Sequence, residues 1–399
     1  MLTPADAERL IAQHLPPLPV ESLPLAQCAG AILRENVYAE RDQPPFDRVS
    51  MDGIAVDSRA VLSGSRRLRI QSTQMAGEAP HTLSSPDACI EVMTGAVLPN
   101  GCDAVIQVEH VELDAGAAVL TAKASVEPGQ NTHRRASDTR KGDQLLTTGS
   151  RLGAPEVAIV ASAGLARAQV SAQPRIVVIS TGNELVEPGE PILAHQIRRS
   201  NSYGLTAALR RQGFERVADD HIPDDLESLR ARLETHLDTH DTLILSGGVS
   251  MGKLDLVPRA LDELGVRRVF HRVEQRPGKP LWFGVSPKGT AVFALPGNPV
   301  STLVCLARYV VPALFGARGL ARPGTERLAL AEPVSVKFPL SVFLPVHVEL
   351  DEAARGWARP RPTNGSGDFT SLAGTAGFVE LPPGPGSWER GFVTRLYRW

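Results

Sequence analysis

The segment from Pro174 to about residue 320 constrains the fold most, because short apolar strands alternate there with amphipathic helical segments. The strand-like runs RIVVIS, DTLILS and AVFAL are separated by helix-like runs such as NSYGLTAALRRQG and DDLESLRARLETHL. This alternation predicts a doubly wound α/β domain, with helices on both faces of the sheet. Ligands of such sheets bind at the carboxyl ends of the strands, so we expect site residues directly after the strands.

The rest of the chain has other patterns. A length of 399 residues exceeds the ~100 to 200 of one domain, so several units are expected. The start, MLTPADAERLIAQHL, predicts a helix with Thr3 as N-cap and Pro4 at N1. Short β segments follow to about residue 145. Residues 151–170 return to a helical pattern with Gly164 marking the helix end, and the Pro-rich region beyond about residue 321 predicts a small β unit.

Composition excludes several classes of protein. Hydrophobic residues make up 42% and charged residues 22%, which is typical of a folded globular protein. The net charge of -2 argues against a dedicated nucleic-acid binder, so any anionic ligand must be held locally. The four cysteines lack metal-ligand spacing and are expected to be reduced thiols. With no signal peptide and no apolar run of about 18 residues, we expect a cytoplasmic enzyme without a membrane segment.

Two strand ends carry turn chemistry suited to an anion. After DTLILS, the segment GGVSMG has glycines at 247, 248 and 252, and a helix begins near Asp255. Such a turn lets backbone N–H groups approach a phosphate, although a plain strand-to-helix turn capped by Asp255 explains it equally well. After RIVVIS, the segment TGNEL places Glu184 at the same edge of the sheet, where a solvated loop carboxylate is the simpler reading.

Two further segments add to this edge. FALPGNP brackets Gly297 and Asn298 between two prolines, which predicts a rigid turn that opens a helix. RPGKP presents Lys279 on a stiff Pro-Gly turn that suits a phosphate or oxyanion, with an ordinary basic turn as the alternative. Special turn chemistry at three strand ends of one sheet favours one shared pocket over three unrelated turns.

The β-rich region contains three short motifs of its own. SMDGIA surrounds Asp52, VMTGAVLP surrounds Thr94, and NTHRRASD ends at Asp138. Taken singly, each is explained by a turn or by a solvated charged loop.

Taken together and in order, these segments resemble a known family. MDG, MTGA, NxxRRxxD, STGNEL, GGVSMGxxD, RPGKP and LPGNPVS, with their spacing, resemble the MoeA and gephyrin E-domain family of molybdopterin molybdenumtransferases from about residue 20 to 315. The resemblance implies an elongated subunit of four domains. They are a helical, discontinuous domain I for dimerisation (1–44 and 142–173), a β-rich domain II (45–141), a molybdopterin-binding α/β domain III (174–320) and a small β domain IV (321–399).

The resemblance also implies an activity, the insertion of molybdenum from molybdate into adenylyl-molybdopterin with release of AMP. Family members are homodimers, and the active site joins domain III of one subunit to domain II of the other. Mg²⁺ is expected because carboxylates alone would repel both anionic substrates. An upstream adenylyltransferase-type protein and acceptor molybdoenzymes are implied partners, whereas nucleic acid and membrane are not.

The expected site residues follow from matching motif positions. The catalytic set comprises Asp52, Thr94 and Asp138, acting in trans, together with Glu184, Asp224 and Asp255, which also bind the metal. No nucleophile is expected, since positioning and electrostatics suffice. The residues expected to hold the pterin, phosphates and oxyanion are Thr181, Gly182, Asn201, Ser202, Ser246, Gly247, Gly248, Ser250, Gly252, Arg272, Arg276, Lys279, Pro296, Gly297, Asn298 and Pro299.

Some positions depart from the family pattern. Arg48 and Val49 replace the usual small residues before MDG, and Ile54 stands where an aromatic is common. A basic residue often seen before FLPVHVEL is missing at residues 339–341. These departures leave open a non-catalytic molybdopterin-binding or carrier protein, although the retained acids favour the transferase. A receptor-clustering scaffold like gephyrin would need fused domains for which this chain has no room.

Overall fold

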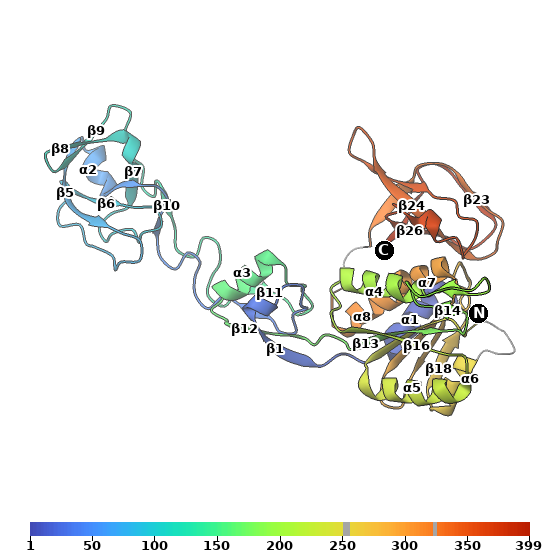
Figure 1. The fold of residues 1–399 in the computed structure, drawn as a ribbon. Helices are drawn as coiled ribbons and strands as arrows, with labels where there is room; N and C mark the ends of the chain where they lie inside the picture. The colour runs from blue at the N-terminus through green and yellow to red at the C-terminus, as the bar shows by residue number, and fades with distance from the viewer. Residues whose placement is uncertain (250–255, 322–324) are drawn as a thin grey trace.

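The computed structural model describes residues 1–249, 256–321 and 325–399. Three residues expected in the site, Ser250, Gly252 and Asp255, therefore lie outside the described residues. Figure 1 shows an elongated chain, with a β-rich unit at one end, a small central unit, and an α/β unit beside a C-terminal β unit at the other end.

The α/β unit is built on a six-stranded sheet of order β16-β13-β17-β21-β20-β18. The first four strands are parallel, and β20 and β18 run antiparallel to their neighbours. Ser180 pairs with Ser246, which in turn pairs with Leu295, so the residues that follow these strands are level with one another. The strands are β13 (Ile176–Thr181), β16 (Val217–Ile222), β17 (Thr242–Ser246), β18 (Arg267–His271), β20 (Trp282–Val285) and β21 (Ala291–Leu295).

Helices cover both faces of this sheet, which confirms the doubly wound prediction. One face packs against α4 (Asn201–Arg211) and a long helical stretch, and the other against α5 (Leu226–Thr239) and α6 (Leu256–Glu263). The long stretch comprises α7 (Pro299–Cys305), a π-helical turn (Leu306–Val310) and α8 (Val311–Ala317). The edge pair β14 (Leu185–Val186) and β15 (Ile197–Arg198) completes the unit.

The stretch Pro299–Ala317 is 19 residues long with a mean hydropathy of 1.6, so it is long and apolar enough to cross a membrane by length and composition. The stretch contains Arg308, and 61% of its most apolar 18-residue window is buried inside the protein, so the expectation of a chain without a membrane segment is not overturned. Leu306, Val310 and Leu314 of the stretch are buried against the sheet, as in the core helix of a globular domain.

The first helix, α1 (Pro4–His14), begins as predicted, because the Thr3 hydroxyl accepts the backbone N–H of Asp6 at 3.1 Å and Pro4 starts the helix. Its apolar residues Ala7 and Ile11 are buried in the core of the α/β unit. A helix that we expected in domain I thus packs on the α/β unit, and the exact domain boundaries stay predictions.

The central unit combines α3 (Ala154–Ser162) with two short antiparallel pairs. Gly164 has a φ of +81°, as expected of a residue that ends a helix. The helical reading of residues 167–170 was wrong, because alternation of exposed Arg167 and Gln169 with buried Ala168 and Val170 makes a strand. The pairs are β1 (Val20–Pro24) with β12 (Arg167–Ser171) and β2 (Val37–Tyr38) with β11 (Gln144–Leu146).

The β-rich unit is a six-stranded sheet of order β7-β4-β6-β5-β9-β8 with the short helix α2 (Ser58–Leu62). A separate antiparallel pair, β3 (Arg48–Val49) with β10 (Thr132–His133), lies at its edge toward the central unit. The sheet strands are β4 (Gly53–Val56), β5 (Arg67–Gln74), β6 (Ala88–Val92), β7 (Ala104–Gln107), β8 (Val111–Asp114) and β9 (Ala117–Leu120).

The C-terminal unit is a small barrel, because β24 pairs with both β25 and β26 and so closes the ring through β22 and β28. The strand β19 (Gln275–Arg276) of the α/β unit extends this sheet by pairing with β24. The strands are β22 (Arg327–Leu330), β23 (Val334–Val336), β24 (Ser341–Leu350), β25 (Gly356–Pro360), β26 (Gly377–Leu381), β27 (Gly386–Trp388) and β28 (Val393–Arg398).

A buried arginine joins this barrel to the α/β unit. Arg308, 2% exposed, lies 3.0 Å from the carboxylate of Glu8 on α1 and 3.2 Å from that of Glu380 on β26. Tyr397 on β28 donates to the same Glu380 carboxylate at 2.8 Å. The position of the barrel over the sheet is thus held by hydrogen bonds as well as by apolar contact.

Candidate active site

A cavity of about 1260 Å³ lies at the carboxyl ends of β13, β17 and β21, between the α/β unit and the barrel. The level register of these strands is what brings their following turns together. Ten of the expected site residues line it, namely Thr181, Glu184, Asp224, Gly247, Gly248, Arg276, Lys279, Pro296, Gly297 and Asn298.

The glycine turn after β17 forms part of the cavity wall. Gly247 and Gly248 have φ of +105° and +66°, which favours glycine at both positions. A Cβ on Gly247 would lie 2.8 Å from the carbonyl oxygen of Thr181, and one on Gly248 would lie 2.6 Å from Val257. Within the described residues, the buried Thr181 hydroxyl has no hydrogen-bond partner, so it is an unsatisfied polar group at this turn.

Other expected residues support the cavity from behind rather than line it. The Asn201 side-chain amide donates to the Ser246 hydroxyl at 2.9 Å and to the Gly297 carbonyl at 2.7 Å, which ties α4 to the ends of β17 and β21. Ser202 is buried beside it in α4. Pro299 occupies the first turn of α7.

Arg272 is not brought into the cavity. Its backbone has a φ of +78°, and its N–H donates to the Leu281 carbonyl at 2.8 Å, in the loop that follows β18. The sequence does not indicate where such a loop points.

Two carboxylates face the cavity from the strand ends. The Glu184 carboxylate folds back over Gly182, where a Cβ would lie 2.6 Å from its Oε2. The backbone N–H of Asp224 donates to the Asn183 side chain at 3.1 Å, which joins the turns after β13 and β16. Among the residues that the structure describes, no three His, Cys, Asp or Glu side chains are grouped closely enough to hold a metal ion by themselves.

The basic turn RPGKP is anchored from below. Gln275 is fully buried, accepts from the Tyr309 hydroxyl and donates to the Pro277 carbonyl at 3.1 Å. Gly278 has a φ of +92°, and a Cβ there would lie 2.7 Å from the Cys305 sulfur. The turn is therefore packed too closely against α7 for a larger residue.

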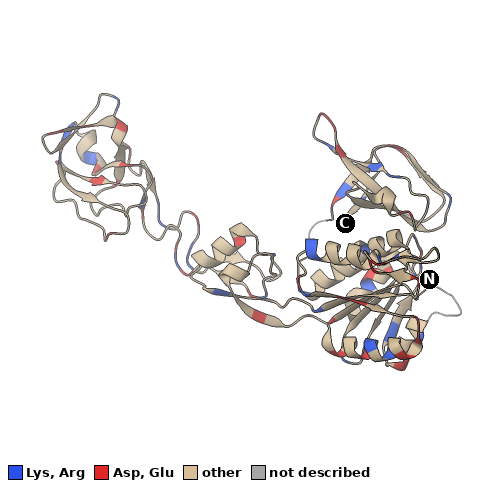
Figure 2. Cartoon of the chain, viewed as in Figure 1, with Lys and Arg blue, Asp and Glu red and all other residues tan. Residues whose placement is uncertain are grey.

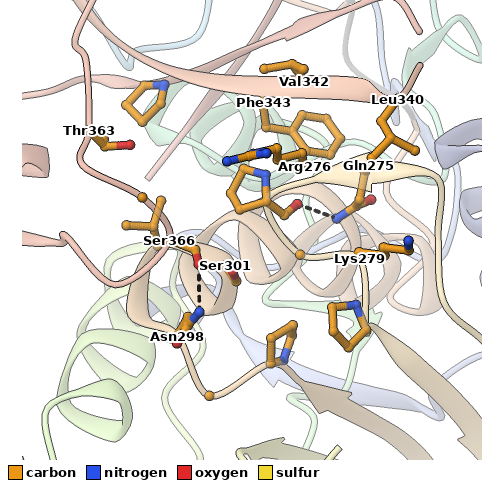
Figure 3. A pocket seen from close by; sticks show the side chains of 18 of the residues that line it. Gln275, Arg276, Lys279, Asn298, Ser301, Leu340, Val342, Phe343, Thr363 and Ser366 are labelled. Atoms are coloured by element: carbon orange, nitrogen blue, oxygen red, sulfur yellow. Dashed lines mark hydrogen bonds between the residues drawn. The ribbon is translucent and has the colours of Figure 1, made fainter. Parts of the chain in front are cut away.

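This anchored turn presents two cations to the cavity. Figure 3 shows Arg276 and Lys279 at its wall. The Arg276 guanidinium lies 4.1 Å from the ring centre of Phe338 in the barrel. Neither cation forms an ion pair with a carboxylate anywhere in residues 1–249, 256–321 or 325–399. Both remain available to an anionic ligand.

The barrel contributes a wall that sequence reasoning missed. Asn298 donates to the Ser366 hydroxyl at 2.6 Å across the junction (Figure 3). Lys337 and Phe338 line the cavity from the segment before β24. The segment GSGDF could have pointed to Ser366, because it belongs to the loosely family-like C-terminal region. No sequence signal pointed to Phe338.

The second group of expected residues lies far from this cavity, in the β-rich unit at the other end of the chain (Figure 1). Asp52 Oδ1 accepts the backbone N–H of Thr94 at 2.7 Å and its hydroxyl at 2.8 Å, and these two bonds lower the pKa of Asp52. Asp138 Oδ1 lies 2.9 Å from His133 Nε2. A single chain therefore does not bring the two groups of acids together.

Charged residues of both signs occur in every unit of the chain. Figure 2 shows Lys and Arg interleaved with Asp and Glu along the chain, whose net charge is -2. Of the four cysteines, which are all free thiols, Cys28, Cys89 and Cys305 are buried. Burial raises the pKa of Cys89 to about 11, so this thiol stays protonated at neutral pH.

Comparison with known proteins covers the whole chain. Residues 2–164 match the MoeA N-terminal region (domain I and II), residues 177–316 a probable molybdopterin binding domain, and residues 327–393 the MoeA C-terminal region (domain IV).

Full-length relatives agree. The chain is 38% identical to a molybdopterin molybdenumtransferase of Synechocystis over 100% of both chains, and 35% identical to one of Synechococcus elongatus over 92% of both. A crystal structure of a molybdopterin biosynthesis MoeA protein from Pyrococcus horikoshii superposes with a TM-score of 0.82 at 32% identity, covering 100% of this chain and 99% of that one. This chain belongs to the MoeA family.

Proposed function

We propose that this protein is a molybdopterin molybdenumtransferase, which inserts molybdenum from molybdate into adenylyl-molybdopterin and releases AMP. The observation that carries the proposal is one cavity with two carboxylates on its strand-end side and two cations, Arg276 and Lys279, on its turn side, which form no ion pair with any other described residue. Both substrates are anions, and the cations match their charge. The family relationship supplies the identity of these substrates.

Mg²⁺ fits the carboxylates that the cavity presents. Magnesium in enzymes is commonly bound by one or two protein carboxylates and completed by substrate phosphates and water. Glu184 and Asp224 face the same cavity and would hold the ion, with Asp255 the third expected ligand. Bound there, Mg²⁺ would neutralise phosphate charge during cleavage of the adenylyl linkage.

The residues of this chain bind and orient the substrates. Arg276 and Lys279 hold oxyanion and phosphate oxygens by charge, on a turn that Gln275 keeps rigid. The glycine turn after β17 lets the pterin phosphate approach the backbone. Rigid placement of two anions side by side, in a cavity walled on two sides, is a sufficient source of rate enhancement for a reaction that needs no nucleophile.

The complete site is formed by a homodimer. Asp52, Thr94 and Asp138 of one subunit reach the cavity of the other, since they cannot reach their own. Asp52 and Asp138 support this arrangement, because hydrogen bonds from Thr94 and His133 hold one carboxylate oxygen of each acid in place. Within the described residues, the other oxygen of each carboxylate makes no hydrogen bond and is available to a ligand.

The protein acts in the cytoplasm, between an adenylyltransferase-type protein that supplies adenylyl-molybdopterin and the molybdoenzymes that accept the product. This placement rests on the chemistry of substrate and product and on the family relationship.

Release of AMP tests the proposal. Purified protein with adenylyl-molybdopterin, molybdate and Mg²⁺ should release AMP, and omission of molybdate or Mg²⁺ should abolish the release. Tight pterin binding without AMP release under any of these conditions would instead identify a non-catalytic carrier.

A further inference from the structure

A chain of three polar side chains runs along the edge of the β-rich unit and ends at Asp138. Arg48 on β3 and His133 on β10 are direct partners in the antiparallel pair. Arg48 Nη2 lies 3.1 Å from His133 Nδ1, and His133 Nε2 lies 2.9 Å from Asp138 Oδ1.

The chemistry of these groups assigns the direction of each hydrogen bond. A guanidinium can only donate, so Nδ1 of His133 must accept from Arg48. The ring proton is therefore on Nε2, which donates to the Asp138 carboxylate. Arg48 thus selects the tautomer of His133, and that tautomer holds one oxygen of Asp138.

The same strand connects Asp138 to the other acid of this unit. Val49 on β3 donates to the Ala96 carbonyl at 2.9 Å and accepts from the N–H of Gly95 at 2.9 Å, directly after Thr94. The chain then continues from β3 to Asp52, which Thr94 holds. The strand β3 therefore lies between the turn that orients Asp52 and the histidine that orients Asp138.

We infer that Arg48 and His133 are positioning residues for the transfer reaction, which direct the second oxygen of Asp138 toward the ligand in the partner subunit. The inference rests on the proposed function, because it gives Asp138 a role in that site. It also gives a physical role to Arg48, which departs from the small residues common in the family: its guanidinium determines the proton position on His133.

The experiment compares Arg48→Met, Arg48→Lys and His133→Phe with Asp138→Asn in steady-state AMP release. Removing residues that orient the ligands of a metal site typically costs roughly 10- to 100-fold in activity, and we take the same range for residues that orient Asp138. We expect a loss of this size in kcat for Arg48→Met and His133→Phe. The KM for molybdate should be unchanged, because both substrates are held by the α/β unit of the partner subunit. Arg48→Lys, which keeps a cationic donor, should recover most of the loss.

Two further readouts separate positioning from general stability. The double variant Arg48→Met, His133→Phe should be as active as the less active of the two single variants, since both residues act through one hydrogen-bonded chain. Nitrogen NMR of the whole protein should show His133 protonated at Nε2 and unprotonated at Nδ1, and a mixture of tautomers in Arg48→Met. The matched control is Arg67→Met, because Arg67 forms an exposed pair with Asp114 at 2.6 Å on another edge of the same unit. It should behave as wild type.

The outcomes distinguish the inference from the proposed function. If Asp138→Asn is inactive while Arg48→Met and His133→Phe retain full kcat, the positioning role is refuted and the transferase site stands. If Asp138→Asn is fully active, Asp138 has no role in the site and the inference fails with it. Additive losses in the double variant, or a His133 tautomer that does not respond to Arg48→Met, would also overturn it.

Discussion

Replacing Arg308 with Met should loosen the barrel from the α/β unit. Arg308 is 2% exposed, and its partners differ in exposure, with the Glu380 side chain at 18% and that of Glu8 at 31%. Burial by itself would lower the pKa of Arg308, but the attraction of Glu380 and its other neighbours outweighs this and raises it. The charge is thus stabilised by its partners.

The size of the effect follows from what the substitution leaves behind. Without Arg308, the Glu380 carboxylate keeps, among the residues that the structure describes, the Tyr397 hydroxyl at 2.8 Å as its hydrogen-bond donor, and it becomes a largely buried, uncompensated charge. Breaking a buried ion pair in this way costs about 3–5 kcal/mol. Glu8 adds little to this cost because it is better solvated.

Urea unfolding and amide hydrogen exchange measure the effect. Arg308→Met should lower the unfolding midpoint and speed exchange in β26 and β28, whereas the double variant with Glu380→Gln should regain part of the loss because no buried charge remains. If Arg308→Met lowered the free energy of unfolding by less than about 1 kcal/mol, which is what an exposed ion pair contributes, this reasoning would be refuted. So would a double variant less stable than the single one.

Three further outcomes are expected. Gly248→Ala forces a Cβ into a space 2.6 Å from a neighbouring side chain at a φ of +66°, so it should destabilise the protein by about 2 kcal/mol or more in urea unfolding and reduce AMP release; wild-type stability would contradict the close packing of this turn. Lys279→Gln should weaken molybdate binding about tenfold, or ~1.4 kcal/mol, as measured by calorimetry. The control Lys288→Gln, at the opposite end of the sheet, should leave molybdate binding unchanged. An equal loss of affinity in both variants would show that only the net charge of the protein matters. Thr94→Ala removes one of the bonds that lower the pKa of Asp52, so the acid limb of the rate profile should move to higher pH; an unmoved limb would exclude Asp52 as the titrating group.

The α/β unit could be predicted from the sequence because its information is local. Short apolar strands and amphipathic helices specify the winding, and the parallel register then makes the turns after β13, β17 and β21 level. Their convergence on one cavity was foreseeable from the turn residues alone. The helix at Thr3 was predictable for the same reason, since its cap lies within the first turn.

What could not be predicted depends on contacts between distant segments. The barrel wall with Phe338 is placed by the pairing of β19 with β24, which joins residues about 65 positions apart and has no local signature. The strand β12 is a different case, because the alternation of Arg167 and Gln169 with Ala168 and Val170 is a local strand signal that the helical pattern of the preceding residues concealed. The segment NTHRRASD that ends at Asp138 was read as a solvated charged loop, because the contact between His133 and Arg48 that orders it comes from a two-residue strand pair.

Mixing two inactive subunits tests whether the active site is shared between two chains. Glu184→Gln should inactivate the cavity and Asp138→Asn the opposing face, and a mixed dimer would contain one site with neither substitution. If subunits exchange at random, half of the dimers are mixed and each has one intact site of two, so AMP release should return to about a quarter of the wild-type rate. Failure of the mixture to recover any activity, when exchange of subunits is verified by mass, would contradict a site shared between two chains.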